Sequence, residues 1–388
     1  MKARLSLLVA LLTFLCPVTF AAQGVPSTEG KSAGYEQLSK AAEQARGENR
    51  DEDAIGFYRK ALALKPEWPE GLWYLGTLLY EKDRYPEARD VLRQFMALQA
   101  DAGPGWALLG MSEFQCHEYP RALDHLQRAM LLGMGDRKEM AQTVSHTVAE
   151  LLIRFERYDD SLNLLFRMLG SGEDKASLIE PVGLAALRMP VLPAEIPAAR
   201  RDLVRMAGEG SVASQTPQFK DADKTFKEMV AAYPHEPGVH FLYGVYLMDL
   251  RPDEAMRELK RELEVSPSHV PARLRLAEVH LQNQEFEEAL ALAQEAVQLE
   301  PDYPSAHLIL GEVEVGRGDS ADGIKELEAA RAKQPTTPRV HWDLIRAYTA
   351  AGRTEDAKHE KEVIEKLSRA NSESQGAPAE GSGDTRPQ

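Results

Sequence analysis

The sequence predicts an all-α protein built as a linear array of paired helices, and two observations carry this prediction. Alanine and leucine dominate the hydrophobic residues, which make up 43% of the 388 residues, and β-branched runs are scarce. This bias favours helix over strand. A pattern of small and bulky residues also recurs along the chain with a period of 34 residues. Such self-similarity is typical of repeat architectures, in which each unit buries its apolar face against its neighbours.

The first 22 residues, MKARLSLLVALLTFLCPVTFAA, have the layout of a secretory signal peptide, 1–22. Lys2 and Arg4 precede a short apolar stretch, which Pro17 interrupts. An uncleaved membrane anchor is the alternative, because no charge appears between Arg4 and residue 23. The short apolar stretch argues against a full membrane span, which needs about 20 residues. We therefore predict cleavage, with membrane proximity through an uncleaved N-terminus as the alternative.

Cleavage would leave an acidic chain with one cysteine. The whole chain has a net charge of −15, and losing Lys2 and Arg4 makes it −17. Such a chain repels phosphates, so we predict no nucleic-acid partner. Cys116 alone cannot form an internal disulfide. A lipid anchor on Cys16 is disfavoured because bacterial lipidation needs a small residue before the cysteine, and Leu15 is not small.

Two segments show the repeat clearly: PEGLWYLGTLLYEKDRYPEARDVLRQFMALQADA, from Pro69, and VPARLRLAEVHLQNQEFEEALALAQEAVQLEPDY, from Val270. They share a small residue at place 8, an aromatic residue at place 17 and alanine at place 20. The matching pairs are Gly76 with Ala277, Tyr85 with Phe286, and Ala88 with Ala289. Small residues at this spacing allow two helices to cross closely, while bulky residues between them fill the core.

This pattern is similar to the tetratricopeptide repeat, which has small residues at places 8, 20 and 27 and bulky ones at places 4, 7 and 11. The resemblance implies antiparallel helix pairs, stacked into a right-handed α-α superhelix (a TPR solenoid) of about nine pairs. The frame also fits further segments of the chain: 35–68, 103–136, 142–175, 237–269, 304–337 and 338–369.

A proline-rich segment, 189–197, interrupts the frame. A first helix is expected over 176–188, but Pro190, Pro193 and Pro197 follow it, and no α-helix runs through three prolines at that spacing. One helix is therefore expected to be missing. We predict a bend here between an N-terminal sub-array, 35–188, and a C-terminal sub-array, 198–369.

The two ends of the chain lack the repeat pattern. Residues 23–34 form a short polar leader before the first repeat. Residues 370–388 are rich in Gly, Ser, Pro and acids and carry no apolar periodicity. This composition predicts a disordered tail.

The sequence predicts no catalytic residue, cofactor or metal. It has no phosphate-binding glycine loop, no G-x-S-x-G, no C-x-x-C and no H-E-x-x-H motif. The repeats also leave no stretch for a separate catalytic domain. His240, His307 and His341 occupy place 4 of their repeats, too far apart to share one zinc ion. We interpret these histidines as half-buried packing residues with satisfied polar tips.

The resemblance implies a concave groove lined by places 2, 5, 9, 12 and 13 of the first helices, where partner segments bind. Large apolar side chains at these places favour a contact surface, although some could instead pack against neighbouring repeats. The predicted partner-binding residues are Trp73, Tyr80, Met111, Phe114, Phe241, Met248, Trp342 and Arg346. The Lys/Asn pair of the family's carboxylate clamp is absent from places 5 and 9.

Together these observations predict a non-catalytic scaffold that binds a protein or peptide partner outside the cytoplasm, as a periplasmic or secreted bacterial protein. A self-assembling structural protein is one alternative. A repeat-containing envelope enzyme, or its regulatory subunit, is another. Mass in dilute solution would separate self-assembly from partner binding.

Overall fold

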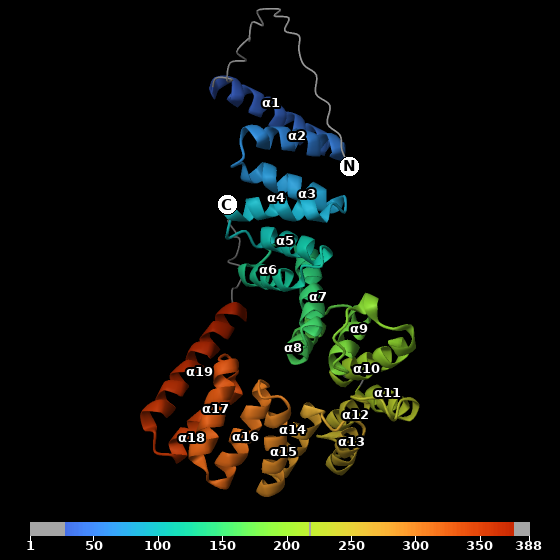
Figure 1. Cartoon of the computed structure of the whole chain (residues 1–388), viewed down its shortest axis with the longest axis vertical. Coiled ribbons are helices and arrows are strands. Elements are labelled where there is room, and N and C mark those ends of the chain that lie inside the picture. The colour runs from blue at the N-terminus through green and yellow to red at the C-terminus, as the bar shows by residue number, and fades with distance from the viewer. Residues whose placement is uncertain (1–27, 217–218, 376–388) are drawn as a thin grey trace, which may run out of the picture. The chain divides into compact units, whose positions relative to one another are not determined.

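The computed structural model describes residues 28–216 and 219–375 and is entirely helical there (Figure 1). These ranges contain 19 α-helices, two short 3-10 helices, η1 and η2, and no strand. The prediction of an all-α array is confirmed. The predicted signal peptide, 1–22, lies outside the described residues.

The chain divides into two compact units, Met1–Val144 and Ser145–Gln388, and the first contains three helix pairs. Figure 1 shows these pairs following one another along the chain. The helices are α1 (Thr28–Gly47), α2 (Asp51–Leu64), α3 (Pro69–Glu81), α4 (Tyr85–Leu98), α5 (Gly103–Gln115) and α6 (Tyr119–Leu132). A proline stands in the first turn of α3, α4, α5 and α6, where its missing N–H costs nothing.

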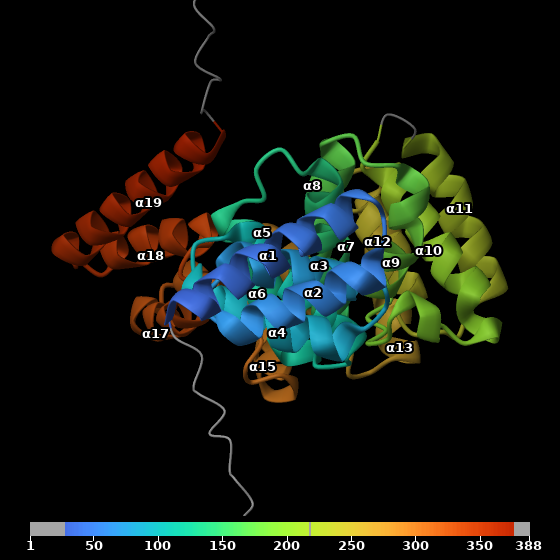
Figure 2. The same cartoon turned by 90° about the horizontal axis from the view of Figure 1, so that it is seen from above.

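Helix α7 (Lys138–Arg154) crosses the division, and the remaining helices belong to the second unit. In Figure 2 the last two, α18 and α19, run side by side. The helices are α8 (Tyr158–Gly170), α9 (Lys175–Ala186), α10 (Arg201–Ser214), α11 (Phe219–Ala232), α12 (Val239–Leu247), α13 (Pro252–Val265), α14 (Val270–Gln282), α15 (Phe286–Leu299), α16 (Pro304–Arg317), α17 (Ser320–Lys333), α18 (Pro338–Ala350) and α19 (Thr354–Gln375).

A glycine at place 8 lets the two helices of a pair approach closely. In five pairs, an added Cβ on this glycine would lie 2.7–2.9 Å from a leucine or phenylalanine on the second helix. The contacts join Gly76 to Leu92, Gly110 to Leu126, Gly210 to Phe226, Gly244 to Leu259 and Gly311 to Leu327. No real side chain fits at that distance, so the small residues of the repeat have the packing role that the sequence predicts.

A left-handed residue reverses the chain between the two helices of seven pairs. It occupies place 15 each time, with φ of 56–61° for the non-glycine residues. These residues are Asn49, Asp83, His117, Glu156, Gln284, Gly318 and Gly352. The residue that follows bonds back to the first helix; the Arg84 N–H, for example, donates to the Leu79 carbonyl at 2.9 Å. This closure satisfies carbonyls that would otherwise lack partners at the helix end.

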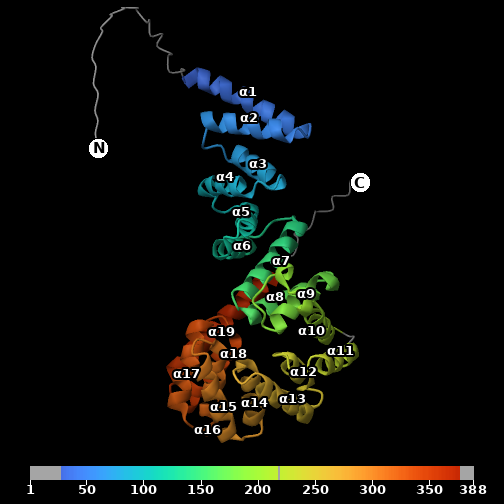
Figure 3. The same cartoon turned by 45° about the vertical axis from the view of Figure 1, so that its right-hand side comes forward.

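Helix α9 is a first helix without a second helix of its own. It ends with the same reversal, at Arg188 (φ 53°), and the chain then forms η1 (Pro193–Glu195) and η2 (Ala198–Arg200) instead of a helix. Helix α10 lies beside α9 in Figure 3 and takes the place of the missing partner. An added Cβ on Gly183 would lie 2.0 Å from the Val204 carbonyl oxygen. With α9 set apart, the helices form nine pairs in the described ranges.

The division between the two compact units falls within α7, after Val144. The sub-arrays 35–188 and 198–369, with the proline-rich break 189–197 between them, stay a prediction. Within the second unit, backbone contact between α9 and α10 holds the chain together across the proline-rich segment. An added Cβ on Gly208 would also lie 2.0 Å from the Ile179 carbonyl oxygen.

The helices at both ends extend into segments predicted to be irregular. Helix α1 begins at Thr28, inside the predicted leader 23–34, and α19 continues to Gln375, beyond residue 370. Extending an existing helix adds one hydrogen bond for each residue fixed, so polar residues join it readily. The remainder of the leader and of the tail 370–388 lies outside the described residues.

Replacing Gly183 by alanine tests the contact between α9 and α10. The new Cβ would meet backbone, which cannot move aside, so Gly183→Ala should lower the free energy of unfolding by about 2–3 kcal/mol. Gly170→Ala, at the end of α8, is the control because nothing lies within 4 Å of its added Cβ. Urea denaturation followed by circular dichroism measures both. Equal stability of the two variants would contradict the packing described.

Candidate protein-binding site

The predicted binding residues of α3 are half-buried and take part in the core of the first unit. Trp73 packs with its ring centroid 5.5 Å from that of Phe95, on the neighbouring helix α4. Tyr80 packs edge-on against Tyr85, at 5.3 Å. Both side chains keep one exposed part, so each serves packing first and offers a partner only a portion of its surface.

The predicted residues of α5, Met111 and Phe114, are also half-buried. Phe114 lies 5.6 Å from Tyr119, which begins α6. The structure therefore places four of the predicted residues, two on α3 and two on α5, along the first helices of successive pairs in the first unit.

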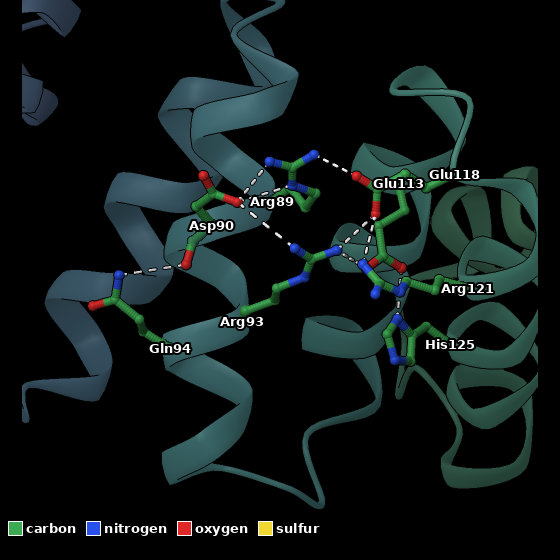
Figure 4. A network of polar contacts seen from close by, with 8 residues as sticks. All are labelled: Arg89, Asp90, Arg93, Gln94, Glu113, Glu118, Arg121 and His125. Carbon is green, nitrogen blue, oxygen red and sulfur yellow. Dashed lines mark hydrogen bonds and ion pairs between the residues drawn. The ribbon is translucent and has the colours of Figure 1, made fainter.

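An ion network fixes α5 and α6 against α4 (Figure 4). Glu113 of α5 is fully buried and accepts hydrogen bonds from Arg93 at 2.8 Å and from His125 at 2.6 Å. Glu118, in the turn before α6, binds both Arg89 and Arg93. Removing one member would leave a buried charge without its partner, which is costly. We interpret this network as structural, since each charged group in it already has a partner.

In the second unit, Phe241 and Met248 lie at the two ends of α12 and are half-buried. The Phe241 ring packs 4.7 Å from the His269 ring, and its N–H donates to Glu262 at 3.1 Å. Met248 packs against the core around Leu247. These two side chains fill space between repeats.

Place 5 of the last three first helices shows how exposure changes along the unit. Leu274 of α14 and Leu308 of α16 are only 5% and 7% exposed, because the following repeats cover them. Trp342 occupies the same place on α18 but is 54% exposed. No further first helix follows α18 in the described residues. Of the predicted large apolar side chains, Trp342 therefore presents the most open face to a partner.

Arg346 lies one turn beyond Trp342 on α18 and its side chain is 70% exposed. It pairs with Asp343, which is itself buried. A guanidinium carries five N–H groups. Arg346 therefore has donors left for a second carboxylate, and the structure brings this cation and an exposed indole together on one helix.

Arg339 ties the same helix to the preceding repeats. It donates two hydrogen bonds to Glu312 of α16, at 2.8 and 2.9 Å, and one to Glu278 of α14, at 3.0 Å. Burial and a hydrogen bond with Asp343 raise the pKa of Glu312 to about 7. This arginine ties three successive first helices together, so the exposed face of α18 is held on a rigid support.

The place-4 histidines are satisfied at both ring nitrogens in three repeats. In each, Nδ1 lies 2.5–2.7 Å from a glutamate at place 23, and Nε2 lies 2.8–3.0 Å from the carbonyl of the proline that ends the preceding repeat. The sets are His240 with Glu258 and Pro234, His307 with Glu326 and Pro301, and His341 with Glu360 and Pro335. The sequence itself carries a signal for this arrangement, because His at place 4 and Glu at place 23 occur together in all three repeats.

Glu150 of α7 is a further residue that the sequence analysis did not single out. It occupies place 9 of the repeat 142–175, as Glu278 and Glu312 do in theirs, so the frame itself could have identified it. Burial alone raises the pKa of the Glu150 carboxyl to about 7. A shifted carboxyl on a first helix is a candidate for function, and buried packing explains it equally well.

The described ranges contain neither a cluster of metal ligands nor a helix suited to span a membrane. Across residues 28–216 and 219–375, no three His, Cys, Asp or Glu side chains gather closely enough to hold a metal ion. None of the helices in those ranges combines the length and apolarity that a membrane span requires.

Models of the tetratricopeptide repeat family match four segments of the chain, 40–105, 246–313, 280–341 and 338–358. These segments cover regular helix pairs of both units. The region around α9 and the proline-rich segment is not among them. A comparison with curated proteins gives no match.

Several solved structures are similar to parts of the chain. A MamA RS-1 ArsTM double mutant aligns with 19% identity over 43% of this chain and 95% of its own, at a TM-score of 0.39. MamA 41-end from Desulfovibrio magneticus RS-1 aligns with 20% identity over 44% and 96%, at 0.36. Yeast Tom70 aligns with 13% identity over 87% and 85%, also at 0.36. Scores this low support no argument about function.

Replacing Glu150 by glutamine tests its buried carboxyl. With a raised pKa, folded protein holds the proton more tightly than unfolded protein, so the wild type loses stability as pH rises from about 4.5 to about 7. Glu150→Gln should therefore gain about 3 kcal/mol over wild type at pH 8 and less than about 1 kcal/mol at pH 5. Thermal melts at both pH values measure this. The exposed Glu287→Gln is the control, and a gain independent of pH would contradict the assignment.

Proposed function

The chain is a tetratricopeptide-repeat protein, and we propose that it is a non-catalytic scaffold that binds a partner protein on the face of α18. The observation that supports this most strongly is Trp342, a large apolar side chain that is 54% exposed. Tryptophan and arginine dominate the energetic centres of protein interfaces. Both occur here one turn apart, on a helix held by the ion pairs of Arg339.

The chemistry of this face favours a segment with a large apolar residue beside an acidic one. The indole of Trp342 would receive the apolar side chain, and the remaining N–H groups of Arg346 would bind the carboxylate. Arg346 is held in place by Asp343, so little side-chain entropy is lost when a second carboxylate binds. The half-buried residues Phe241 and Met248 act mainly as the support of this unit.

The share of the chain that the helix pairs occupy also supports a scaffold. Helix pairs of one type fill nearly all of residues 28–216 and 219–375, so the fold offers a surface made by repetition. We propose no catalytic role for the ion pairs described, because each charged group in them faces a partner that neutralises it.

Panning a peptide library against the full-length protein tests the binding face. Enriched peptides should contain a large apolar residue next to Asp or Glu. Trp342→Ala and Arg346→Gln should each weaken their binding by about tenfold or more. Leu250→Ala is the control, because Leu250 is 50% exposed and lies in a turn away from α18. Binding that survives both α18 changes, or that is lost in the control, would contradict the proposal.

We further propose that the protein acts outside the cytoplasm, as a periplasmic or secreted protein. The support is the sequence of residues 1–22, with its basic start, apolar stretch and proline. The acidic remainder and its single cysteine are compatible with an oxidising compartment.

Expression in a bacterial host with an export pathway tests this location. Mass spectrometry of the purified protein should show a new N-terminus close to residue 23, and fractionation should recover the protein with periplasmic markers. Replacing Leu8 and Leu11 by aspartate should block both, because charge in the apolar stretch prevents recognition. An intact N-terminus at Met1 in the wild type would contradict cleavage.

A further inference from the structure

Five residues of the second unit meet although they are far apart in the sequence, and we call this group the clasp: Tyr158, Asp159, Arg188, Glu300 and Tyr303. The Tyr303 hydroxyl donates a hydrogen bond to Asp159 at 2.6 Å across 144 residues of chain. By comparison, the bond from Arg339 to Glu278 spans 61 residues. The clasp thus joins the start of α8 and the end of α9 to the turn between α15 and α16.

Arg188 lies at the centre of the clasp. Its guanidinium carbon lies 4.8 Å from the Tyr158 ring centroid and 5.6 Å from that of Tyr303, so the cation contacts both aromatic rings. Glu300 approaches it at 4.0 Å. The left-handed conformation at the end of α9 turns this residue out of the helix. It also lines a cavity of about 210 Å³, together with Leu187, Gly238, Ser268 and His269.

We propose that the clasp is a conformational latch: the second unit has a closed form, in which α8 and α9 are tied to the α15–α16 turn, and an open form in which they separate. Every clasp residue stands at a helix end or in a turn, so separation breaks no helix pair. In a repeat array each helix pair contacts only its neighbours, and the curvature follows from the small rotations between successive pairs. A small polar contact across many repeats therefore selects the curvature.

The contacts of the clasp suit reversible opening. They consist of one hydrogen bond, two cation–aromatic contacts and a long ion pair, and Asp159 and Glu300 are both partly open to water. Water can replace these partners one by one. Tyr158 belongs to the core of helices α7 to α13, and Tyr303 packs against the separate core around Val270 and Ala293. Opening therefore separates two cores and leaves each of them intact.

The latch would regulate partner binding at α18, and this regulatory role rests on the proposed function. The spacing of α14 and α16 follows from the curvature, and α18 is bound to both through Arg339. A partner that prefers one curvature shifts the balance between the two forms. Closure itself is measured without any partner, so a failed latch and a failed binding face are distinguishable.

The distance between α8 and α15 tests the latch in the full-length protein. Cysteines introduced as Asn163→Cys and Gln298→Cys, both at exposed sites, take spin labels after Cys16→Ser and Cys116→Ser. Double electron–electron resonance should give a narrow distance distribution with the wild-type clasp. Tyr303→Phe with Arg188→Gln should broaden it and shift it to longer distances, and circular dichroism should show unchanged helix content.

Matched controls separate the latch from a general loss of stability. Tyr233→Phe with Arg200→Gln removes a similar pair of contacts, to Asp202 and Glu236, that join neighbouring elements. These changes should leave the distribution as it is in the wild type. The proposal is overturned if the clasp variant keeps the wild-type distribution, if the controls broaden it equally, or if the wild type itself shows no narrow closed population.

Discussion

At five helix crossings among the described residues, the first helix of a pair meets its second helix with no room for a side chain at place 8, and the other features follow from this close approach. Glycine at place 8 lies against a leucine or phenylalanine of the second helix, and Gly183 lies against the backbone of α10 itself. The approach fixes how the two helices of a pair cross. The crossing in turn fixes where the next pair can stack, and so which side chains remain at the surface.

The crossing residues explain why the sequence predicts the helices so well. Gly76 and Ala88 stand at fixed places because packing tolerates nothing larger there, so the pattern is visible without a structure. The missing second helix after α9 is equally visible, since Pro190 and Pro193 cannot enter a helix. The repeat frame cannot identify the partner of α9. That partner is α10, which also pairs with α11: Gly208 on one face of α10 contacts α9, and Gly210 on another face contacts α11.

The candidate site is less predictable from the sequence than the fold. Leu274, Leu308 and Trp342 share place 5, yet only Trp342 is open, because exposure depends on whether another repeat follows. Phe241 is half-buried for the related reason that neighbouring helices close around it. A repeat frame gives the direction of a side chain from its own helix. It does not give the curvature of the array, which is a sum of small rotations over many pairs.

Polar groups connect the pairs in ways that a search for apolar patterns overlooks. His307 reaches its own second helix through Glu326 and the preceding repeat through the Pro301 carbonyl. His341 repeats the arrangement with Glu360. Trp106, at the same place of its repeat, also donates to the carbonyl six residues earlier, that of Ala100. An indole has a single donor, so it cannot bind a glutamate of the second helix as well. These histidines therefore combine packing with a directional tie between successive repeats.

The large sequence separation between the clasp residues has a consequence for folding during synthesis on the ribosome. Helix pairs contact mostly their neighbours, so each can form soon after it is synthesised, as expected for a chain of low contact order. The bond between Asp159 and Tyr303 must wait until the whole intervening stretch has emerged, and closing so large a loop carries an entropic penalty. The carboxylate of Asp159 and the cationic end of Arg188 thus wait for Tyr303 throughout that interval, when a nascent-chain chaperone would meet them first.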